Sequence, residues 1–386
     1  MTQSSVDGFS LELNQWCKAK LVSSFSTVSR EDLCCNGVIV YGISIQGKST
    51  VASLLQTGIV PDWIIDKNIK LVGQEYAGIK IRHIDSLKET GSRFIILAST
   101  HIAEMINICD YYQTKWILNY AIRDFCPLVP DWGITSVQNL PHNEILNTYH
   151  LFADNKSLQI YMRFIKYHYT YFNDFSDIHD PIDYFPSDLK SRIDYSHFVD
   201  CGACDGDTLN LWLSNFNADG NNCSYYAIEP NWASFCKLQA QISKLPKSIS
   251  SYINAYNCGV ADRSYEVRLN QSSGIGAGFK ISPYSVAEID TAEQNRITIN
   301  RIDDLLIETK PTIIKADVEG FEMALLNGAA RTIKKYRPTL AISVYHKCSD
   351  IWKIPSWINN LNLNYDIYLR HQPTVFTDTT CYAIPR

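Results

Sequence analysis

Residues Phe198–Thr208 read Phe-Val-Asp-Cys-Gly-Ala-Cys-Asp-Gly-Asp-Thr, and this stretch decides the fold of the chain. Phe198 and Val199 are typical of the end of a buried parallel strand, and Gly202 and Gly206 permit a tight turn. The apolar residues that follow have the i, i+3, i+4, i+7 spacing of one helix face: Leu209, Trp212, Leu213 and Phe216. The pattern predicts a strand, a glycine turn and a helix. Such a unit places backbone N–H groups at the carboxyl edge of a sheet, where doubly wound folds bind nucleotide-like ligands.

The acidic residues of this turn indicate the charge of its ligand. Asp200, Asp205 and Asp207 would repel a pyrophosphate and attract a molecule that bears an ammonium and a sulfonium group. We therefore expect S-adenosylmethionine rather than a dinucleotide. The residues of the turn that we expect to bind this cofactor are Asp200, Gly202, Asp205, Gly206 and Thr208. An acidic turn without a ligand is the alternative.

Two further acidic residues fit the same cofactor. Glu229 ends the short apolar strand 225–228, 29 residues after Asp200, and is expected to bind the ribose hydroxyls. Pro230 suits the first turn of the helix that follows. Asp262, after a third strand and its exit at 252–260, is a candidate partner for the adenine amino group. A turn residue without a ligand role is an equal reading of Asp262.

Composition narrows the class of protein. A chain of 386 residues is expected to form two domains, and its net charge of −5 argues against a nucleic-acid partner. The twelve cysteines show no repeated pair spacing, so we expect reduced thiols and a cytoplasmic location. No apolar run approaches the 18 residues of a membrane span, and the N-terminus lacks a signal-peptide pattern. With nucleic acid and a membrane span excluded, we expect a small-molecule or glycan substrate. A homo-oligomer is compatible with the sequence.

A second strand and glycine turn lies in the N-terminal half. The residues Gly42–Ser49 match the phosphate-loop pattern, although Ile43 and Ile45 suit a phosphate cradle poorly. The same residues fit a degenerate dinucleotide-type turn, with Asp66 as the ribose-facing carboxylate and Ser44 in place of the middle glycine. Strands and helices alternate from there to Leu118. We expect a Rossmann-like domain at 1–120, and the sequence leaves its ligand open.

The fold class follows from the order of these elements. The alternation stops in a helical connector at 121–190, and the sheet that begins at Phe198 occupies a second domain at 191–386, ending in a hairpin of strands 365–369 and 380–384. We predict an α/β protein of two doubly wound, three-layer domains.

Charged residues gather after two later strands of the C-terminal half. Lys315, Asp317 and Glu319, with Glu322, follow the strand 312–314, and Tyr345, His346 and Lys347 follow the strand 339–344. Both strands should end at the sheet edge where the substrate meets the cofactor. The carboxylates suit magnesium, but an internal pair of Lys315 with a glutamate is favoured, so no metal is expected.

With these residues assembled, the chain resembles the FkbM family of S-adenosylmethionine-dependent methyltransferases. The resemblance rests on Val-Asp-Cys-Gly-Ala-Cys-Asp-Gly-Asp-Thr at 199–208, Ile-Glu-Pro-Asn at 228–231, Ile-Lys-Ala-Asp-Val-Glu-Gly-Phe-Glu at 314–322, Ser-Val-Tyr-His-Lys at 343–347 and Tyr-Leu-Arg-His at 368–371. Ala316 departs from the Ile or Leu of the family pattern. The family implies a class I methyltransferase fold of seven strands with the last antiparallel, and methyl transfer commonly to oxygen on sugars or other natural products. The N-terminal half resembles the Rossmann-like domain of some bacterial members, often found alongside polysaccharide genes.

The cofactor would bring an activated methyl group, so the protein has to align the reactants and remove a proton. We expect His346 to be the general base and Asp317 to position the cofactor amine or the acceptor hydroxyl, with Glu319 and Lys315 as further catalytic residues. Three other classes stay open: a nicotinamide-dependent oxidoreductase that uses Gly42 and Asp66, a phosphate-loop NTPase that uses Lys48, and a non-catalytic carbohydrate-binding scaffold.

Overall fold

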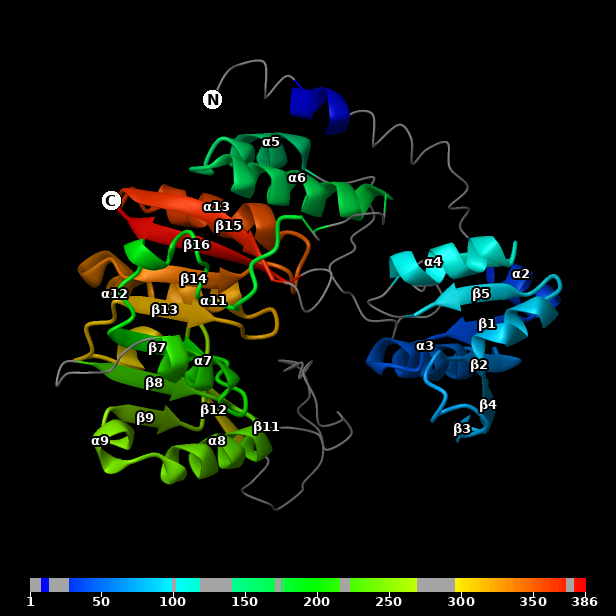
Figure 1. Cartoon of the computed structure of the whole chain (residues 1–386), viewed down its shortest axis with the longest axis horizontal. Coiled ribbons are helices and arrows are strands. Elements are labelled where there is room, and N and C mark those ends of the chain that lie inside the picture. The colour runs from blue at the N-terminus through cyan, green and yellow to red at the C-terminus, as the bar shows by residue number, and fades with distance from the viewer. Residues whose placement is uncertain are drawn as a thin grey trace. The chain divides into compact units, whose positions relative to one another are not determined.

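The structure, a computed structural model, describes residues 8–13, 28–98, 102–118, 141–170, 175, 177–215, 223–268, 296–372 and 378–386. The chain divides into two compact units (Figure 1). One comprises Met1–Leu140 with Met162–Asp174, and the other comprises Pro141–Tyr161 with Phe175–Arg386. The helix α6 (Asn155–Thr170) crosses this division. The boundaries expected from sequence, 1–120, 121–190 and 191–386, stay a prediction.

The N-terminal unit is built on one six-stranded sheet of order β3-β4-β2-β1-β5-β6, parallel except for β3. Its strands are β1 (Val38–Tyr41), β2 (Trp63–Ile65), β3 (Glu75–Tyr76), β4 (Ile79–Arg82), β5 (Phe94–Leu97) and β6 (Lys115–Leu118). Its other elements are α2 (Arg30–Asn36), α3 (Ile45–Gln56), the 3₁₀ helix η1 (Ile84–Glu89) and α4 (Ile102–Tyr111).

Both faces of this sheet are covered, as the alternation of side chains along β1 shows. Val40 packs on one face in a cluster with Leu54 of α3. Tyr41 packs on the other face in a cluster with Cys109 of α4. Successive side chains of a strand point to opposite faces, so a wholly apolar strand requires a covering layer on each side. This confirms the expected α/β arrangement.

The C-terminal unit is built on a seven-stranded sheet of order β15-β16-β14-β13-β7-β8-β9. The strand β16 lies antiparallel between β14 and β15, so the last strand of the chain is the antiparallel one, as expected. The strands are β7 (His197–Cys201), β8 (Ser224–Ile228), β9 (Ile253–Tyr256), β13 (Ile313–Ala316), β14 (Thr339–Ser343), β15 (Tyr365–His371) and β16 (Thr379–Pro385). The predicted terminal hairpin is confirmed as β15 and β16.

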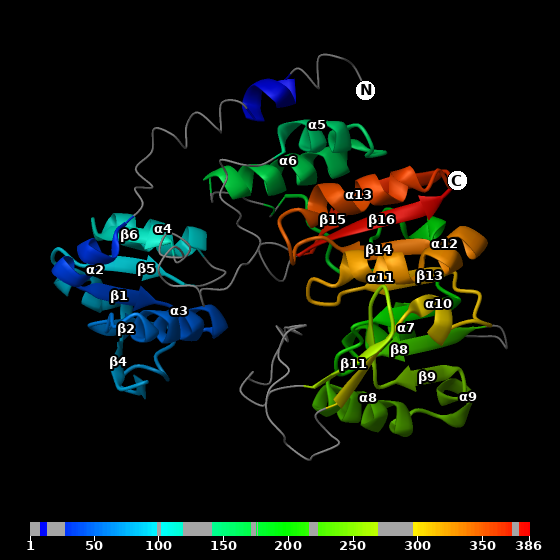
Figure 2. The same ribbon diagram turned by 180° about the vertical axis from the view of Figure 1, so that it is seen from behind.

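Helices lie on both sides of this sheet (Figures 1 and 2). They are α5 (His142–Tyr149), α7 (Asp207–Asn215), α8 (Trp232–Lys244), α9 (Lys247–Ser250), α10 (Ile302–Leu305), α11 (Glu322–Gly328), α12 (Ala330–Tyr336) and α13 (Asp350–Asn360), with the short 3₁₀ helix η4 (Lys190–Arg192). A small second sheet of order β10-β12-β11 forms from β10 (Gly259–Val260), β11 (Tyr265–Arg268) and β12 (Arg296–Asn300).

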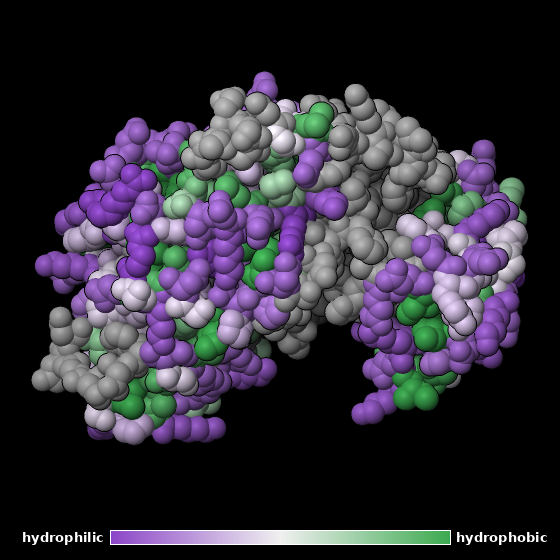
Figure 3. Space-filling model, turned by 45° about the horizontal axis from the view of Figure 1, so that its top comes forward, coloured by the Kyte–Doolittle hydropathy of each residue, from purple (hydrophilic) through white to green (hydrophobic). Residues whose placement is uncertain are grey.

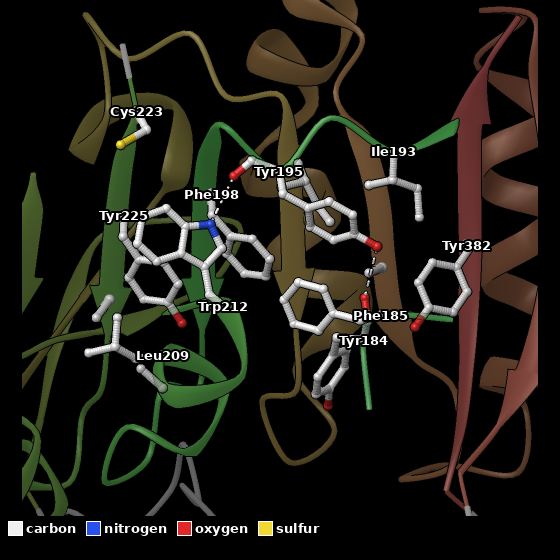
Figure 4. Packing of buried hydrophobic residues seen from close by; sticks show 14 of the residues in the cluster. Tyr184, Phe185, Ile193, Tyr195, Phe198, Leu209, Trp212, Cys223, Tyr225 and Tyr382 are labelled. Carbon is white, nitrogen blue, oxygen red and sulfur yellow. Dashed lines mark hydrogen bonds between the residues drawn. The ribbon is translucent and has the colours of Figure 1, made fainter. Parts of the chain in front are cut away.

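An aromatic cluster holds α7, the helix after the glycine turn, against the sheet (Figure 4). The rings of Phe198 on β7 and Tyr225 on β8 stack with centroids 5.2 Å apart. Trp212 of α7 packs on Tyr225 and donates its indole N–H to the carbonyl of Tyr195 at 2.9 Å. Tyr195 in turn donates its hydroxyl to the carbonyl of Tyr184 at 3.3 Å. The segment before β7 is therefore fixed beside the helix that follows the glycine turn.

A buried arginine ties the C-terminal hairpin to the segments that precede the sheet. Arg370 on β15 is about 1% exposed. Its guanidinium donates to both carboxylate oxygens of Asp188, at 3.1 and 2.7 Å, and to Asp154 at 2.6 Å. Two carboxylates and a planar fork of donors compensate the cost of burying this charge.

In the described part of the chain, no helix combines the length and apolar character that crossing a bilayer requires. Polar side chains cover most of the described surface in Figure 3, and the apolar ones form small separate groups.

Candidate active site

The glycine turn brings the end of β7 against the end of β13. Gly202 has a φ of +81°, and a Cβ at this position would lie 1.8 Å from the carbonyl oxygen of Asp317. The N–H of Asp317 donates to the carbonyl of Cys201 at 3.0 Å. Only glycine permits this approach without a clash. The turn expected to bind the cofactor therefore touches the backbone of an expected catalytic residue.

Asp200 and Lys315 form a buried ion pair beneath the turn. Their oxygen and nitrogen are 2.9 Å apart, and Lys315 Nζ also donates to the carbonyl of Gly202 at 2.8 Å. Tyr225 donates to the other oxygen of Asp200 at 2.5 Å. Burial lowers the pKa of Lys315, but the negative charges of Asp200 and Asp317 raise it above its ordinary value. The lysine is therefore charged, and it holds the turn.

This pair corrects one expectation about Lys315. The predicted internal pair exists, but its partner is Asp200 rather than a glutamate, because β13 and β7 are neighbours and Lys315 lies in register with Asp200. Both side chains are at most 2% exposed. A direct contact of either charge with a ligand would require this pair to open, so their place in the structure fits support of the turn.

Glu229 lies where a ribose-binding carboxylate was predicted. It follows β8, is about 7% exposed, and accepts the N–H of Cys204 at 2.9 Å and that of Asn231 at 2.7 Å, one on each oxygen. Burial raises its pKa, while the two backbone hydrogen bonds oppose that rise. Each carboxylate oxygen accepts more than one hydrogen bond, so acceptor capacity remains for hydroxyl groups.

The other expected cofactor residues differ in exposure. Thr208 is buried at the start of α7, and its N–H donates to the carboxylate of Asp207 at 2.6 Å. Asp205 is half-buried in the turn. Gly206 has a φ of +100° and packs close to α8. Asp262 is exposed, two residues after β10.

Asp317 is the centre of a second group of side chains, beside the turn. One of its oxygens accepts the hydroxyl of Tyr184 at 2.7 Å and that of Tyr345 at 3.2 Å. Burial, followed by the charge of Asp317, raises the pKa of both tyrosines well above the ordinary value, so both remain donors. The other oxygen lies 3.4 Å from Nε2 of His346. The carboxylate is thus held from two sides.

His346 lies among three carboxylates. Its Nδ1 is 2.8 Å from Glu322, and its Nε2 is 3.4 Å from Asp317 and 3.6 Å from Glu319. Burial lowers its pKa, but the hydrogen bond and charge of Glu322, with the charges of Asp317 and Glu319, raise it to about 9. The imidazole is therefore protonated at neutral pH in this arrangement. The base role expected for His346 requires that this proton leaves first.

Glu322 is completely buried behind this imidazole. Its Oε1 also accepts the N–H groups of Val318 at 3.0 Å and Gly320 at 3.3 Å. Its Oε2 is buried and has no hydrogen-bond partner among the described residues. Burial and the negative charge of Glu322 raise the pKa of the nearby Asp350 to about 7. The charges of Lys347 and His346 oppose this rise.

A strained turn presents Glu319. Its φ is +52° and that of Gly320 is +94°. Lys347 donates to the carbonyl of Gly320, which fixes the turn from the end of β14. A non-glycine residue whose backbone lies in the left-handed region costs about 1 to 3 kcal/mol, and such residues cluster at functional sites. Asp317, Glu322 and His346 each offer one ligand atom within 4.8 Å of the others, a spacing that a metal ion could bridge.

Three residues of this group were not predicted. Tyr184 reaches Asp317 from the segment before the first strand, and its ring lies 5.0 Å from Lys315 Nζ. Tyr345 was expected beside His346 at this sheet edge, but no role was predicted for it. Asp350 begins α13 and resembles any acidic residue in a first helical turn. The place of Tyr184 just ahead of the strand at Phe198 allows it to lie over the cofactor cleft, and Tyr345 follows a strand that ends at this edge, but the sequence does not predict their hydrogen bonds to Asp317.

The geometry of the N-terminal turn at Gly42–Ser49 favours a dinucleotide-type turn over a phosphate loop. The helix α3 begins at Ile45, so Lys48 lies inside it, and a Cβ on Gly47 would lie 1.9 Å from the carbonyl oxygen of Gly42. This close packing of strand and helix is the geometry of a dinucleotide-type turn rather than of a loop around a phosphate. Asp66 accepts the N–H of Ile43 at 3.0 Å.

Comparisons with known proteins agree with this geometry. Residues 200–367 match the family model described as the Methyltransferase FkbM domain. Among solved structures, the chain is similar to methyltransferase FkbM from Methylobacillus flagellatus KT, with a TM-score of 0.70 and 22% identity, covering 98% of this chain and 100% of that one. At this identity the likeness shows the fold alone.

Weaker likenesses carry no argument. The DszA carbon methyltransferase gives a TM-score of 0.29 at 9% identity, covering 74% of this chain and 69% of that one. Aspartate semialdehyde dehydrogenase II from Vibrio cholerae gives 0.21 at 9% identity, covering 90% and 91%. A search of curated proteins found no match. The family match and the fold together confirm the predicted resemblance to the FkbM methyltransferases, which the family model places at residues 200–367.

Proposed function

We propose that the C-terminal unit transfers a methyl group from S-adenosylmethionine to an oxygen of a hydroxylated small molecule or glycan. The observation that carries the proposal is the direct contact between the two halves of the site. The turn at Gly202 meets the backbone of Asp317, and Asp317 is hydrogen-bonded to Cys201. Residues suited to a cationic cofactor and residues suited to a hydroxyl group thus share one sheet edge.

The side chains of the turn fit S-adenosylmethionine by charge. Asp205, Asp207 and Glu229 are carboxylates at one sheet edge, and the nearby Lys315 is already paired with Asp200. Glu229 can bind two ribose hydroxyls while it keeps the turn in place through Cys204. The cofactor would supply a methyl group on a sulfonium, and the tasks left to the chain are orientation and proton removal.

The acidic group at β13 and β14 fits an acceptor hydroxyl. Asp317 is about 25% exposed and Glu319 about 35%, so both carboxylates reach the solvent-facing side of the site. A hydroxyl held by Asp317 would lie beside the turn. Fixed placement of two reactants can lower a barrier by about 7 to 11 kcal/mol. Sugars present many hydroxyl groups to such carboxylates, which supports a carbohydrate acceptor.

Proton removal would add about a hundredfold or more. We keep His346 in this role, in contact with the acceptor oxygen through Nε2, because Nδ1 is already held by Glu322. Its proton must first pass to solvent or be displaced. Asp317 keeps the acceptor and the imidazole in place.

Calorimetry of the full-length chain with S-adenosylmethionine tests the proposal, with NADH and ATP in parallel. We expect binding of the sulfonium cofactor that weakens in Glu229→Ala and persists in His346→Ala. We also expect His346→Ala to reduce turnover by about a hundredfold. Cofactor binding without turnover on any hydroxylated acceptor would instead favour a carbohydrate-binding scaffold, and tight binding of NADH alone would favour an oxidoreductase.

A further inference from the structure

Three carboxylates surround the ring nitrogens of His346. Asp317, Glu319 and Glu322 all lie within 3.6 Å of a ring nitrogen of His346. Lys315 is committed to Asp200, and Lys347 donates to the backbone of Gly320. One imidazole therefore faces three carboxylates. Buried and half-buried charges of one sign are costly unless a counter-charge is present.

The imidazole is oriented as a metal ligand is oriented. Glu322 holds Nδ1 at 2.8 Å and is itself fixed by the N–H groups of Val318 and Gly320. This arrangement directs Nε2 toward Asp317 and Glu319. Histidines that bind metals usually donate their other N–H to a carboxylate, which sets the tautomer and the ring orientation.

The distances at Nε2 fit a shared ion better than hydrogen bonds. Nε2 lies 3.4 Å from Asp317 and 3.6 Å from Glu319. A charge-assisted hydrogen bond from nitrogen to a carboxylate is about 2.7 to 2.9 Å long. Ligand atoms that each lie about 2.1 Å from one ion are separated by about 3.0 Å at a coordination angle of about 90° and by about 3.6 Å at an angle of about 120°.

A buried oxygen gives an independent indication. Glu322 is completely buried, and its Oε2 has no hydrogen-bond partner among the described residues. A buried carboxylate oxygen left in this way costs about 1 to 3 kcal/mol or more. Glu322 also belongs, with Asp317 and His346, to the group whose ligand atoms lie within 4.8 Å of one another. A cation in this group would lower the cost of that oxygen.

We infer that His346 Nε2 and Asp317 bind a divalent transition-metal cation, with Glu319 as the third protein ligand and Glu322 behind the imidazole. The site stands on its own geometry. Only its role rests on the proposed function: an ion at Nε2 would bind the acceptor hydroxyl and make it more acidic, and so would take the place of His346 as the group that promotes proton removal, whereas His346 is the base when no ion is bound.

The ligand set indicates the class of ion. Two carboxylates and one imidazole suit Mn²⁺, Fe²⁺ or Zn²⁺, whereas Mg²⁺ prefers oxygen ligands and water. Three protein ligands leave coordination positions open for water or an acceptor oxygen. We therefore choose Mn²⁺ as the probe, because free Mn²⁺ gives an electron paramagnetic resonance signal that diminishes on binding.

The test uses the full-length chain, stripped with a chelator and titrated with MnCl₂ without S-adenosylmethionine. We expect about one bound Mn²⁺ per chain, displaced by Zn²⁺. Asp317→Asn and His346→Gln should each weaken binding by tenfold or more, and Glu322→Gln should weaken it about 10-fold to 100-fold as an outer carboxylate. Thermal unfolding of each variant shows whether it is folded.

His83→Gln is the matched control. His83 forms an exposed pair with Asp85 at 2.9 Å in the N-terminal unit, where no further acidic partner of the ring appears among the described ion pairs. Its loss should leave Mn²⁺ binding unchanged. Binding that is absent in the unchanged chain up to 1 mM Mn²⁺, on the order of the weakest protein sites, would overturn the inference, as would equal binding in folded Asp317→Asn and His346→Gln.

The two proposals fail separately. Methylation that proceeds at an unchanged rate in chelator with no bound ion would overturn the catalytic role of the ion and leave the methyltransferase proposal intact, whereas absence of Mn²⁺ binding would overturn the site itself. Bound Mn²⁺ in a chain that never binds S-adenosylmethionine would overturn the proposed function and leave the metal site.

Discussion

The two units contain the same turn with different chemistry beside it. A glycine with positive φ follows the first strand in each, Gly42 at +100° and Gly202 at +81°. An acidic residue after the second strand accepts an N–H of the turn in each, Asp66 from Ile43 at 3.0 Å and Glu229 from Cys204 at 2.9 Å. The local geometry of a nucleoside-type site is therefore present twice.

The neighbouring strand makes the difference. In the C-terminal unit Lys315 of β13 lies in register with Asp200, and the chain continues into Asp317. In the N-terminal unit the corresponding strand β5 places Ile96 in register with Val40, and the strand ends in Leu97 and Ala98. The same turn is thus supported by a buried ion pair in one unit and by apolar packing in the other. The turn permits binding, and the adjacent strand supplies the reactive groups.

The largest effect should follow from removing the buried lysine. Lys315→Met leaves the completely buried Asp200 without its cation, and we expect a loss of about 3 to 5 kcal/mol in the free energy of unfolding. Urea unfolding of the C-terminal unit measures it. Asp200→Val combined with Lys315→Ile copies the apolar pair of the N-terminal unit, and should recover more than half of that loss. No recovery would show that the two turns are not supported in comparable ways.

Asp317→Asn should break the chemical side of the comparison. The amide keeps the shape of the carboxylate but loses its charge, and we expect turnover to fall about a hundredfold. Affinity for S-adenosylmethionine, measured by calorimetry, should change little. Asp66→Asn, at the N-terminal turn, is the control and should leave turnover unchanged. A fall in cofactor affinity as large as the fall in turnover would place Asp317 in the cofactor site.

Glu229→Gln should separate the two acidic residues that end the second strands. Hydrogen bonds to a charged group contribute about 1.5 to 3 kcal/mol, so S-adenosylmethionine should bind roughly tenfold to a hundredfold more weakly. Asp66→Asn tests the counterpart under the same conditions. If both variants lower the affinity for S-adenosylmethionine equally, the N-terminal turn takes part in the same binding event and the two turns do not differ in function.

The smallest effect should come from Tyr184→Phe. This change removes one hydrogen bond to Asp317 and leaves the ring in its aromatic cluster. A hydrogen bond is worth about 0.5 to 1.5 kcal/mol, so turnover should fall roughly threefold to tenfold with the melting temperature nearly unchanged. Tyr345→Phe removes the other tyrosine hydrogen bond to Asp317 and measures its effect on turnover in the same way. Full activity in the double variant would show that Asp317 needs neither tyrosine.

Much of the architecture could be predicted. The run that ends at Tyr41 is apolar throughout, and the run that ends at Cys201 has Phe198 and Val199 before Asp200. Each precedes a glycine, which is sufficient to place a buried parallel strand and a tight turn. Asp317 and His346 could be expected together, because strands of one parallel sheet end at one edge. The protonation of His346 could not be predicted, because it depends on Glu322 at Nδ1.

The amino-acid sequence alone determined the strands, the glycine turns, the strand-end carboxylate Glu229 and the resemblance of residues 200–367 to the FkbM methyltransferase domain, because these depend on short-range spacing and residue type. Only the tertiary structure decided that Lys315 pairs with Asp200. It also decided that Tyr184 donates a hydrogen bond to Asp317, which lies 133 positions later in the chain. Such partners are chosen by which segments the packed sheet brings within hydrogen-bond distance, and a linear pattern contains no record of that distance.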